Sequence, residues 1–372
     1  MTTPSRPTNH RIHLYPNFTQ VNVKLYRYPH SQKCELEKQV KELLDKSKIQ
    51  PSTSLFSSSV LLVRKKDESW RCCVDYRALN VVTIRDRFPM PTVDELLDEL
   101  GGATWFSKLD LRQGFHQILM HPEDIAKTAF RTHHGHYEYQ VMSFSLCNAP
   151  SMFQATINTL LGPFLRCFVV VFFNDILVYS SSLPQHVSHL QQLFQCLLDS
   201  QFYLKISKCL FAKRQLEYLG HIIFAVGVQS DPSKIQAVLT WSPPANVKAL
   251  RSFFGLTGFY QNFVKGYAII ASPITTLLGK DAFVRTSEAQ HAFTTLKQAM
   301  TRALILALLD FFVPFIVGMD ASGTTMGAVL MQRNQLVEYF SKSFSPKLLH
   351  SSIYKKVFLV IIRINYMNNV MI

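Results

Sequence analysis

Two apolar runs in residues 168–179 meet at a short polar turn. The first run ends at Phe173, Asn174 and Asp175 follow, and the second run continues to Tyr179. Two apolar strands joined by a tight turn predict a buried β-hairpin. Polar side chains at its tip indicate either a functional site or an ordinary turn, and because Asn and Asp are common turn residues the turn alone favours the second interpretation. Other parts of the chain must decide between them.

The size and charge of the chain set limits on its class. With 372 residues, 48% of them hydrophobic, the chain can form two or three cored domains. Its 39 Lys and Arg residues outnumber 25 Asp and Glu residues, which gives a formal net charge of +14. This excess suits a polyanionic partner such as nucleic acid, although many basic proteins have only a solvated basic surface.

The cysteines and the apolar segments indicate an intracellular protein without a membrane span. None of the seven cysteines has the C-x-x-C or Cys/His spacing of a zinc site, so we expect reduced thiols. The polar N-terminus lacks the apolar core of a secretion signal. The longest apolar stretch, residues 303–319, is interrupted by Asp310 and Pro314, which favours two buried elements over a membrane helix.

Helical and strand patterns alternate along the chain and predict an α+β protein. Residues 1–25 have no sustained period and are interpreted as a leader or linker. Apolar spacing and capping residues predict the other elements. These are a helix over 32–48, a hairpin over 60–76, a helix from the capping box at 92–95, a strand ending at Asp110, helices over 149–161 and 185–199, and helices that start after Asp231, Asn246 and Ser287.

Two aspartates lie at the ends of predicted strands. Asp110 ends the apolar strand 104–109, and Asp175 begins the second strand of the hairpin. Carboxylates delivered by strands of one sheet can hold paired divalent ions, which stabilise the attacking and leaving oxygens in phosphoryl transfer. Two unrelated strand-end aspartates would give the same pattern, so these residues alone leave both interpretations open.

Ordered motifs along nearly the whole chain resemble one known family. They occupy residues 60–67, 70–80, 88–103, 106–118, 127–132, 148–150, 175–180, 218–221 and 250–260. In this order they resemble the reverse transcriptase segment of the Pol polyprotein of gypsy-type LTR retrotransposons, plant elements in particular. The resemblance implies an RNA-directed DNA polymerase whose partners are an RNA or DNA template-primer and deoxynucleoside triphosphates; it leaves the oligomeric state open.

The resemblance also implies a domain order. It predicts a right-hand polymerase with fingers and palm over residues 26–225 and a thumb over 231–278. A truncated RNase H-like α/β unit over 281–372 follows, with Asp320 on its first acidic strand. The next carboxylate expected in that unit is replaced by Val357, and the chain ends at Ile372, before the family's later aspartates. We therefore expect no RNase H activity and interpret Asp320 as a relic.

Metal and nucleotide ligands are implied by the same resemblance. Asp110 and Asp175 are the expected ligands of Mg²⁺ or Mn²⁺, and the backbone carbonyl of Leu111 lies beside Asp110. The remaining implied contacts involve the nucleotide. Lys65 and Arg71 are expected to bind the incoming triphosphate, Phe115 to exclude a ribose 2′-hydroxyl, and Lys205 or Lys208 to lie near the leaving pyrophosphate, although any single lysine could equally be a solvated surface charge.

One departure from the family bears directly on catalysis. The family's turn has two adjacent aspartates, and the first of them is Asn174 in this chain. A carboxamide offers one oxygen but no negative charge, so we expect weaker metal binding and impaired polymerisation. A non-catalytic nucleic-acid-binding relic and a pseudogene product without function are the alternatives. Glu68 also replaces a glycine of the family, at the tip of the fingers hairpin, where a special backbone conformation is expected, and Ser47 replaces a glycine after a helix.

Overall fold

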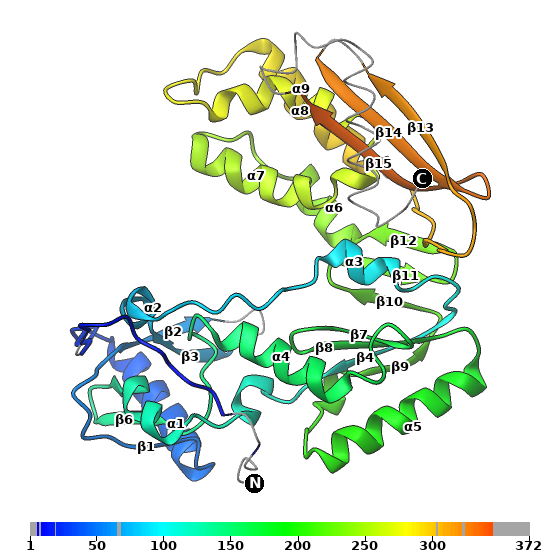
Figure 1. Cartoon of the computed structure of the whole chain (residues 1–372). Helices are drawn as coiled ribbons and strands as arrows, with labels where there is room; N and C mark the ends of the chain where they lie inside the picture. Colours follow the sequence, from blue (N-terminus) through cyan, green and yellow to red (C-terminus); the bar gives the residue numbers. More distant parts are fainter. Residues whose placement is uncertain are drawn as a thin grey trace. The chain divides into compact units, whose positions relative to one another are not determined.

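The computed structural model describes residues 6, 9–18, 20–64, 68–302, 304–321 and 324–344, with the backbone alone at 320 and 321. The chain divides into two compact units (Figure 1). The first contains residues from 1–92, 108–178 and 187–210, and the second contains residues from 93–107, 179–186 and 211–372. Strands β4 (Trp105–Asp110) and β8 (Asp175–Ser180) and helix α5 (Leu183–Asp199) each include residues of both sets.

The described elements up to residue 213 mix helices and strands. In chain order they are α1 (His30–Asp45), β1 (Ile49–Pro51), β2 (Ser59–Arg64), β3 (Trp70–Asp75), α2 (Arg77–Val82), α3 (Val93–Asp98), β4 (Trp105–Asp110), η1 (Gly114–Gln117), η2 (Pro122–Thr128), β5 (Phe130–Arg131), β6 (His136–Tyr139), α4 (Ala149–Leu161), β7 (Val169–Phe172), β8 (Asp175–Ser180), α5 (Leu183–Asp199), η3 (Ile206–Lys208) and β9 (Leu210–Lys213).

The described elements beyond residue 213 begin with strands and continue with helices. They are β10 (Gln215–Tyr218), β11 (His221–Phe224), β12 (Gly227–Ser230), α6 (Pro232–Leu239), α7 (Val247–Phe259), η4 (Gln261–Phe263), α8 (Tyr267–Thr275), η5 (Thr276–Leu278), α9 (Ser287–Thr301), β13 (Ile316–Ala321), β14 (Thr325–Gln332) and β15 (Gln335–Ser343).

The first unit is organised around one apolar core. The predicted hairpin forms from β2 and β3, which pair from Ser59↔Asp75 to Arg64↔Trp70. Strands β7, β8, β4 and β9 form one sheet in that order. Almost every side chain of β7 and β8 is buried, because both faces of this hairpin are covered. Helix α4 contributes Phe153 and Ile157 to the same core.

An extended N-terminal segment is part of the first unit. We call residues 9–18 and 20–23 the N-terminal strap. Its backbone forms hydrogen bonds with the rest of the unit at three places. His10 N donates to Leu119 O at 2.8 Å, Tyr15 N to Val82 O at 3.0 Å, and Val23 N to Ser57 O at 2.9 Å. These residues fall within the predicted leader, yet Ile12 is only 2% exposed.

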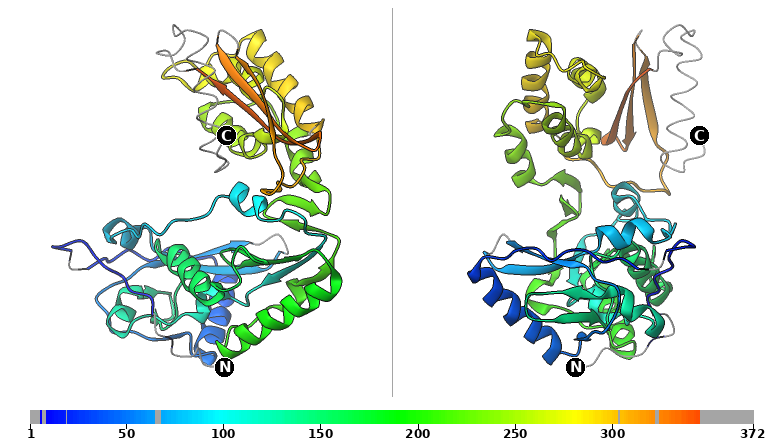
Figure 2. Two further views of the ribbon diagram at one scale, coloured as in Figure 1. Left: turned by 45° about the vertical axis from the view of Figure 1, so that its right-hand side comes forward. Right: turned by 90° about the vertical axis from the view of Figure 1, so that its left-hand side faces the viewer.

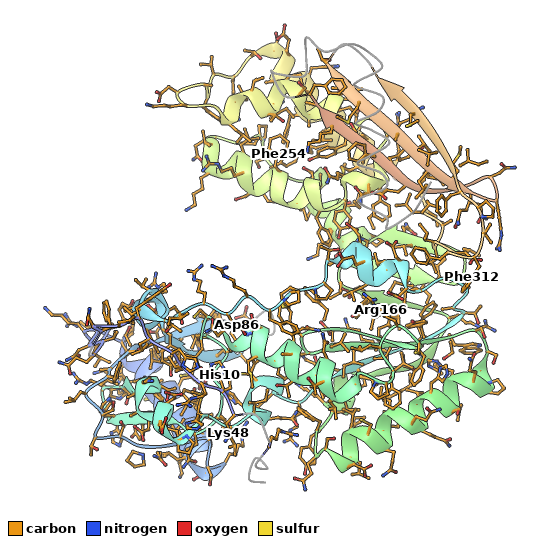
Figure 3. The ribbon with its side chains drawn as sticks, viewed as in Figure 1. His10, Lys48, Asp86, Arg166, Phe254 and Phe312 are labelled. Carbon is orange, nitrogen blue, oxygen red and sulfur yellow. The ribbon has the colours of Figure 1, made fainter. Side chains whose placement is uncertain are left out.

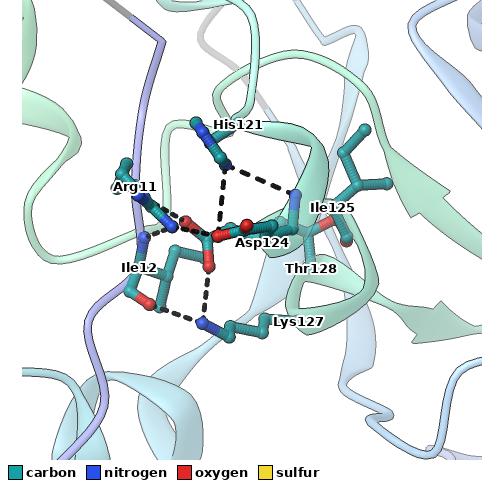
Figure 4. A network of polar contacts seen from close by, with 8 residues as sticks. Arg11, Ile12, His121, Asp124, Ile125, Lys127 and Thr128 are labelled. Carbon is teal, nitrogen blue, oxygen red and sulfur yellow. Dashed lines mark hydrogen bonds and ion pairs between the residues drawn. The ribbon is translucent and has the colours of Figure 1, made fainter.

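A buried carboxylate anchors the strap (Figure 4). Asp124, which is 1% exposed, accepts the Ile12 backbone N–H at 3.1 Å on Oδ2 and the Lys127 ammonium at 2.5 Å on Oδ1. The Arg11 Nε also donates to Oδ2, at 3.3 Å. Although burial opposes ionisation, these donors together lower the pKa of Asp124 below its usual value.

The second unit combines helices with antiparallel sheets (Figure 2). Strands β13, β14 and β15 form an antiparallel sheet with β14 in the centre, and helix α8 packs against β15. The Ala268 backbone N–H donates to Ser341 Oγ at 2.9 Å across that contact. Helices α7 and α9 meet through the rings of Phe253 and Phe293, whose centroids are 4.7 Å apart.

Local signals in the sequence located most helix starts. The Asp231 and Asn246 side chains cap α6 and α7 as predicted, by accepting the backbone N–H groups of residues 233 and 249. The third predicted cap is wrong by one residue. Thr286 Oγ1, not the Ser287 hydroxyl, accepts from Ala289 N at 3.1 Å, because the helix already begins at position 287.

The special backbone conformation expected at Glu68 is confirmed, with a φ of 62°. Ser47, which also stands where the family has glycine, has a φ of 50°. L-residues rarely adopt this left-handed region, and glycine adopts it without strain. The seven cysteines are free thiols, as expected. Among the described residues, no helix combines the length and apolar composition of a membrane span.

Candidate active site

A cleft of about 760 Å³ opens within the first unit. Helix α1, strand β3, the end of β4 and the residues at the two ends of η3 contribute to its walls. Three acidic side chains line the cleft within the described part of the chain: Glu35, Glu42 and Asp110. The six basic side chains that line it are Lys38, Lys46, Lys48, Arg71, Lys205 and Lys208. This excess of positive charge favours an anionic ligand.

The β7–β8 hairpin ends in a two-residue turn at this cleft. Phe172 pairs with Asp175, so Phe173 and Asn174 form the turn. Phe173 has a φ of 51°, which is the conformation that the first turn residue adopts in hairpins of type I′ or II′. Its backbone N–H donates to the Gln154 Oε1 of helix α4 at 2.8 Å, and this bond holds the tip in place.

Asn174 faces the cleft, and its amide oxygen is buried. The Leu111 backbone N–H donates to the Asn174 main-chain oxygen at 3.3 Å, which ties the turn to the end of β4. The side-chain Oδ1 is buried and has no hydrogen-bond partner among the described residues. Asn174 and Leu111 both line the cleft. A buried acceptor without a donor is a position where a cation or a water molecule is expected.

Asp110 also lines the cleft, with two predicted lysines beside it. Its main-chain oxygen accepts from the Lys205 backbone N–H at 2.8 Å, and its Oδ2 lies 3.4 Å from the Lys208 ammonium. Both lysines line the cleft. The structure thus brings Asp110 together with both candidate pyrophosphate-binding lysines, and the pairing with Lys208 partly neutralises the carboxylate.

Asp175 has a different environment. Its Oδ1 lies 3.7 Å from the Lys108 ammonium, whose side chain is 20% exposed. Asp175 is absent from the described residues that line the cleft, whereas Asn174 is among them. Asn174 therefore lines the cleft, and Asp175, which follows it at the start of β8, lies beside Lys108.

Aromatic side chains and Arg71 form another part of the cleft wall. Phe115 is 6% exposed and contacts the Phe144 ring edge to face, with centroids 5.2 Å apart. The Arg71 guanidinium carbon lies 4.7 Å from the centre of the same Phe144 ring. A cation above an aromatic face is attracted by the ring electrons. Arg71 and Phe115, predicted separately as nucleotide contacts, thus meet through one phenylalanine.

Two supporting residues were not identified from the sequence. Gln154 is fully buried, and besides holding Phe173 it donates its amide to Val171 O at 3.1 Å. Asn80 donates to Ser145 O at 2.9 Å and accepts from Cys147 N at 2.9 Å, which fixes the loop beside Phe144. Gln154 belongs to helix α4 and Asn80 to helix α2. A polar residue among the apolar residues of a helix was the sequence feature that could have indicated both.

The oxygen atoms at the cleft match a divalent ion in type. Asp110, Asn174 and the main chain of Leu111 offer the hard oxygens that Mg²⁺ prefers, and the unpartnered Asn174 Oδ1 is consistent with an ion there. The described residues contain no cluster of three or more His, Cys, Asp or Glu side chains suited to a metal. The set therefore fits a divalent ion in ligand type but is short of negative charge.

Three predicted positions lie outside what the structure describes. Lys65 and Val357 are outside the described residues, and for Asp320 the backbone alone is described, opposite Gly327 in the β13–β14 pair.

Comparison with known proteins gives two matching family models. Residues 63–223 match the family described as reverse transcriptase (RNA-dependent DNA polymerase). Residues 286–366 match the RNase H-like domain found in reverse transcriptase.

Curated relatives are polyproteins of transposons. The chain is 38% identical over 346 residues to the retrovirus-related Pol polyprotein from transposon 297 of Drosophila melanogaster, covering 91% of this chain and 33% of that protein. It is 35% identical to the Pol polyprotein from transposon gypsy of the same species, with coverage of 82% and 31%. The Tf2-3 polyprotein of Schizosaccharomyces pombe is 32% identical, with coverage of 93% and 27%. The chain thus spans about a third of the length of these relatives.

Solved structures with a similar fold come from foamy virus. The foamy viral protease-reverse transcriptase in complex with an RNA/DNA hybrid superimposes with a TM-score of 0.81 at 21% identity, covering 97% of this chain and 51% of that chain. A dRH form in complex with double-stranded DNA gives a TM-score of 0.82 at 21% identity, with coverage of 95% and 66%. This likeness confirms the predicted α+β polymerase fold.

Proposed function

Because this chain belongs to the reverse transcriptases of gypsy-like LTR-retrotransposon Pol polyproteins, we propose that its cleft binds an RNA or DNA template-primer and a deoxynucleoside triphosphate for RNA-directed DNA synthesis. The excess of basic side chains in the cleft supports a polyanionic ligand. The structures of the foamy viral protein with an RNA/DNA hybrid and with double-stranded DNA support this ligand class by analogy of fold.

The proposed domain assignment follows the family. Fingers and palm occupy residues 26–225, the thumb 231–278 and the RNase H-like domain 281–372. The matched segments, 63–223 and 286–366, fall within the first and last of these ranges and support them. We assign Asp320 to the first acidic strand of the RNase H-like domain.

The nucleotide is proposed to contact three cleft residues. Arg71 binds the triphosphate through its guanidinium, supported by its position over the Phe144 ring. Phe115 excludes a ribose 2′-hydroxyl, supported by its buried, well-packed ring. Lys208, already 3.4 Å from Asp110, is the better candidate of the two lysines for the leaving pyrophosphate, because its ammonium and not its backbone approaches that carboxylate.

Polymerisation in this copy is proposed to be weak or absent. Metal ions, when bound, would stabilise the attacking and leaving oxygens of the phosphoryl group. Asp110, Asp175 and the amide of Asn174 would hold them, and reverse transcriptases generally use such ions. The single observation that carries the impairment is the neutral Asn174 side chain at the cleft, where the family supplies a carboxylate.

Primer extension on an RNA template tests both parts of this proposal. The wild-type chain and the Asn174→Asp variant are compared with Mg²⁺ and with Mn²⁺, since Asp and Asn have nearly the same shape. We expect the variant to incorporate nucleotides at least about 10 to 100 times faster, the range that loss of a supporting group alone costs at a metal site. Equal incorporation by both proteins would contradict the impairment.

A second candidate function is favoured by the same residue. A protein that keeps the basic cleft but lacks the metal site would bind nucleic acid without extending it. Tight and steeply salt-dependent binding of a template-primer, with no incorporation by wild type or variant, would support this non-catalytic role.

A further inference from the structure

Lys48 has a fixed place on the wall of the cleft, between α1 and β1 (labelled in Figure 3). Ser47, with its φ of 50°, turns the chain after α1. The Lys48 backbone is then held on both sides, because its N–H donates to Leu43 O and its oxygen accepts from Gln140 N, each at 2.9 Å. Ile49 beside it is 3% exposed and anchors the strand. The main chain that carries the Lys48 side chain is therefore held in place.

The Lys48 ammonium contacts two neutral groups. It donates to the Gln113 amide oxygen and lies 3.2 Å from His116 Nδ1. Burial, with the nearby Lys48 and Arg71 charges, lowers the pKa of His116 to about 3, so its ring is neutral and can accept a hydrogen bond at pH 7. Gln113 follows Asp110 by three residues, which brings Lys48 next to the segment that carries the candidate catalytic carboxylate.

The part of the chain that the structure describes supplies no carboxylate to neutralise this lysine, since none of its Asp or Glu oxygens lies within 4.0 Å of the ammonium. Half-burial, together with the positive charges of Lys46 and Arg112, lowers the pKa of Lys48 to about 8. A half-buried cation among neutral acceptors and other cations is unfavourable unless an anion joins it.

We infer that Lys48 is a phosphate-binding residue of the cleft, whose anion is a phosphate group of the nucleic-acid backbone or of the nucleotide. An ammonium has three donors, and the two neutral contacts leave one for a phosphate oxygen. This inference rests on the proposed function, and it adds a residue outside the family motifs to the cleft. Asp110 and Arg71 line the same cleft as Lys48.

Lys46 provides a matched control two residues away. It lines the same cleft, but its ammonium lies 3.5 Å from Glu42 Oε2, so it already has a counter-ion. Its side chain is 50% exposed. Replacement of either lysine by glutamine removes one charge from the same wall, and only Lys48 is expected to be a direct ligand.

The first arm of the test measures template-primer binding by fluorescence anisotropy over a series of salt concentrations, without nucleotide. If Lys48 contacts the nucleic-acid backbone, Lys48→Gln weakens binding and reduces the salt slope by about one, and Lys46→Gln leaves the slope as in wild type. The second arm measures binding of a deoxynucleoside triphosphate to the preformed complex by calorimetry. If Lys48 contacts the triphosphate, Lys48→Gln weakens this step roughly tenfold instead.

Two further measurements distinguish loss of the Lys48 contact from loss of folding. Lys48→Arg keeps the charge and is expected to retain most of the binding, and thermal unfolding shows that the variants are folded. Wild-type affinity in both arms for a folded Lys48→Gln protein would overturn the inference alone. Wild-type protein that binds neither ligand would overturn the proposed function and the inference with it.

Discussion

The Asn174 side chain fills the space beside Gly114. A Cβ atom at position 114 would lie 2.3 Å from Asn174 Oδ1 and 2.8 Å from Phe153 Cζ, both closer than atoms can approach without moving. Gly114 begins the turn η1, four residues after Asp110. The absence of a side chain at 114 is therefore what allows the hairpin tip to approach the end of β4.

Replacement of this glycine should destabilise the protein. Gly114→Ala must displace the Asn174 amide or the Phe153 ring, and over-packing of this kind costs about 1–3 kcal/mol. Urea unfolding measures the change. Gly255→Ala is the control: nothing lies within 4 Å of a Cβ there, and because the position is inside α7 the alanine should stabilise the helix by up to about 1 kcal/mol. Equal stability of Gly114→Ala and wild type would contradict the close approach.

Divalent ions should stabilise the Asn174→Asp variant more than wild type. The added carboxylate restores a charged oxygen at the cleft, and an ion present at 100 times its Kd raises the free energy of unfolding by about 2.7 kcal/mol. Thermal unfolding with and without Mg²⁺ or Mn²⁺ measures this without any need for catalysis. Adding Asp110→Asn to the variant should remove the effect. An identical shift for wild type and variant would show that position 174 does not bind the ion.

The sequence predicted regular elements well because their signals are local. The helix 149–161 has the predicted bounds, and Asp231 and Asn246 cap the helices that follow them. The hairpin with Asn174 at its tip also follows from the two apolar runs that meet at a polar turn and from a family motif. The backbone conformation at Glu68 was expected from the glycine that the family has there.

Long-range contacts could not be predicted in the same way. The N-terminal strap is held by pairs of backbone hydrogen bonds at three separate places, residues 57, 82–84 and 119–121, which leave no periodic pattern in the sequence. Gln154 supports the turn from 19 residues away. Lys48 reaches Gln113 across 65 positions, and nothing in its neighbourhood of the chain distinguishes it from Lys46. Each of these residues acquires its role only when separate segments meet.

The Asp124 network should contribute substantially to stability. Asp124→Ala leaves the Lys127 ammonium and the Ile12 N–H without their buried acceptor, and breaking a buried ion pair on one side costs about 3–5 kcal/mol. Urea unfolding measures the loss, and limited proteolysis should show earlier cleavage in the strap. The control Glu123→Ala removes an exposed partner of Arg11 and should cost no more than about 1 kcal/mol. A similar loss for both variants would contradict the special role of Asp124.

Acid should destabilise the protein well above the pH at which carboxylates titrate. Burial lowers the pKa of His10 and His221 to about 4 and that of His116 to about 3, whereas the unfolded chain has histidines near 6.5. Below about pH 6.5 the unfolded state therefore binds more protons than the folded state. The stabilisation from these neutral rings is complete above that pH and is lost as the pH falls towards 4.

Urea midpoints at a series of pH values between 7.5 and 4.5 test this expectation. The midpoint should fall steadily below about pH 6.5. His221→Gln, which removes a ring packed against Phe259, Tyr260 and Phe263, should lower the midpoint at pH 7.5 and reduce its dependence on pH. Replacing the exposed His291 by glutamine should leave the profile as in wild type. A midpoint that stays constant from pH 7.5 to 5 would show that the buried histidines do not control acid stability, because their protonation would then cost the folded state nothing.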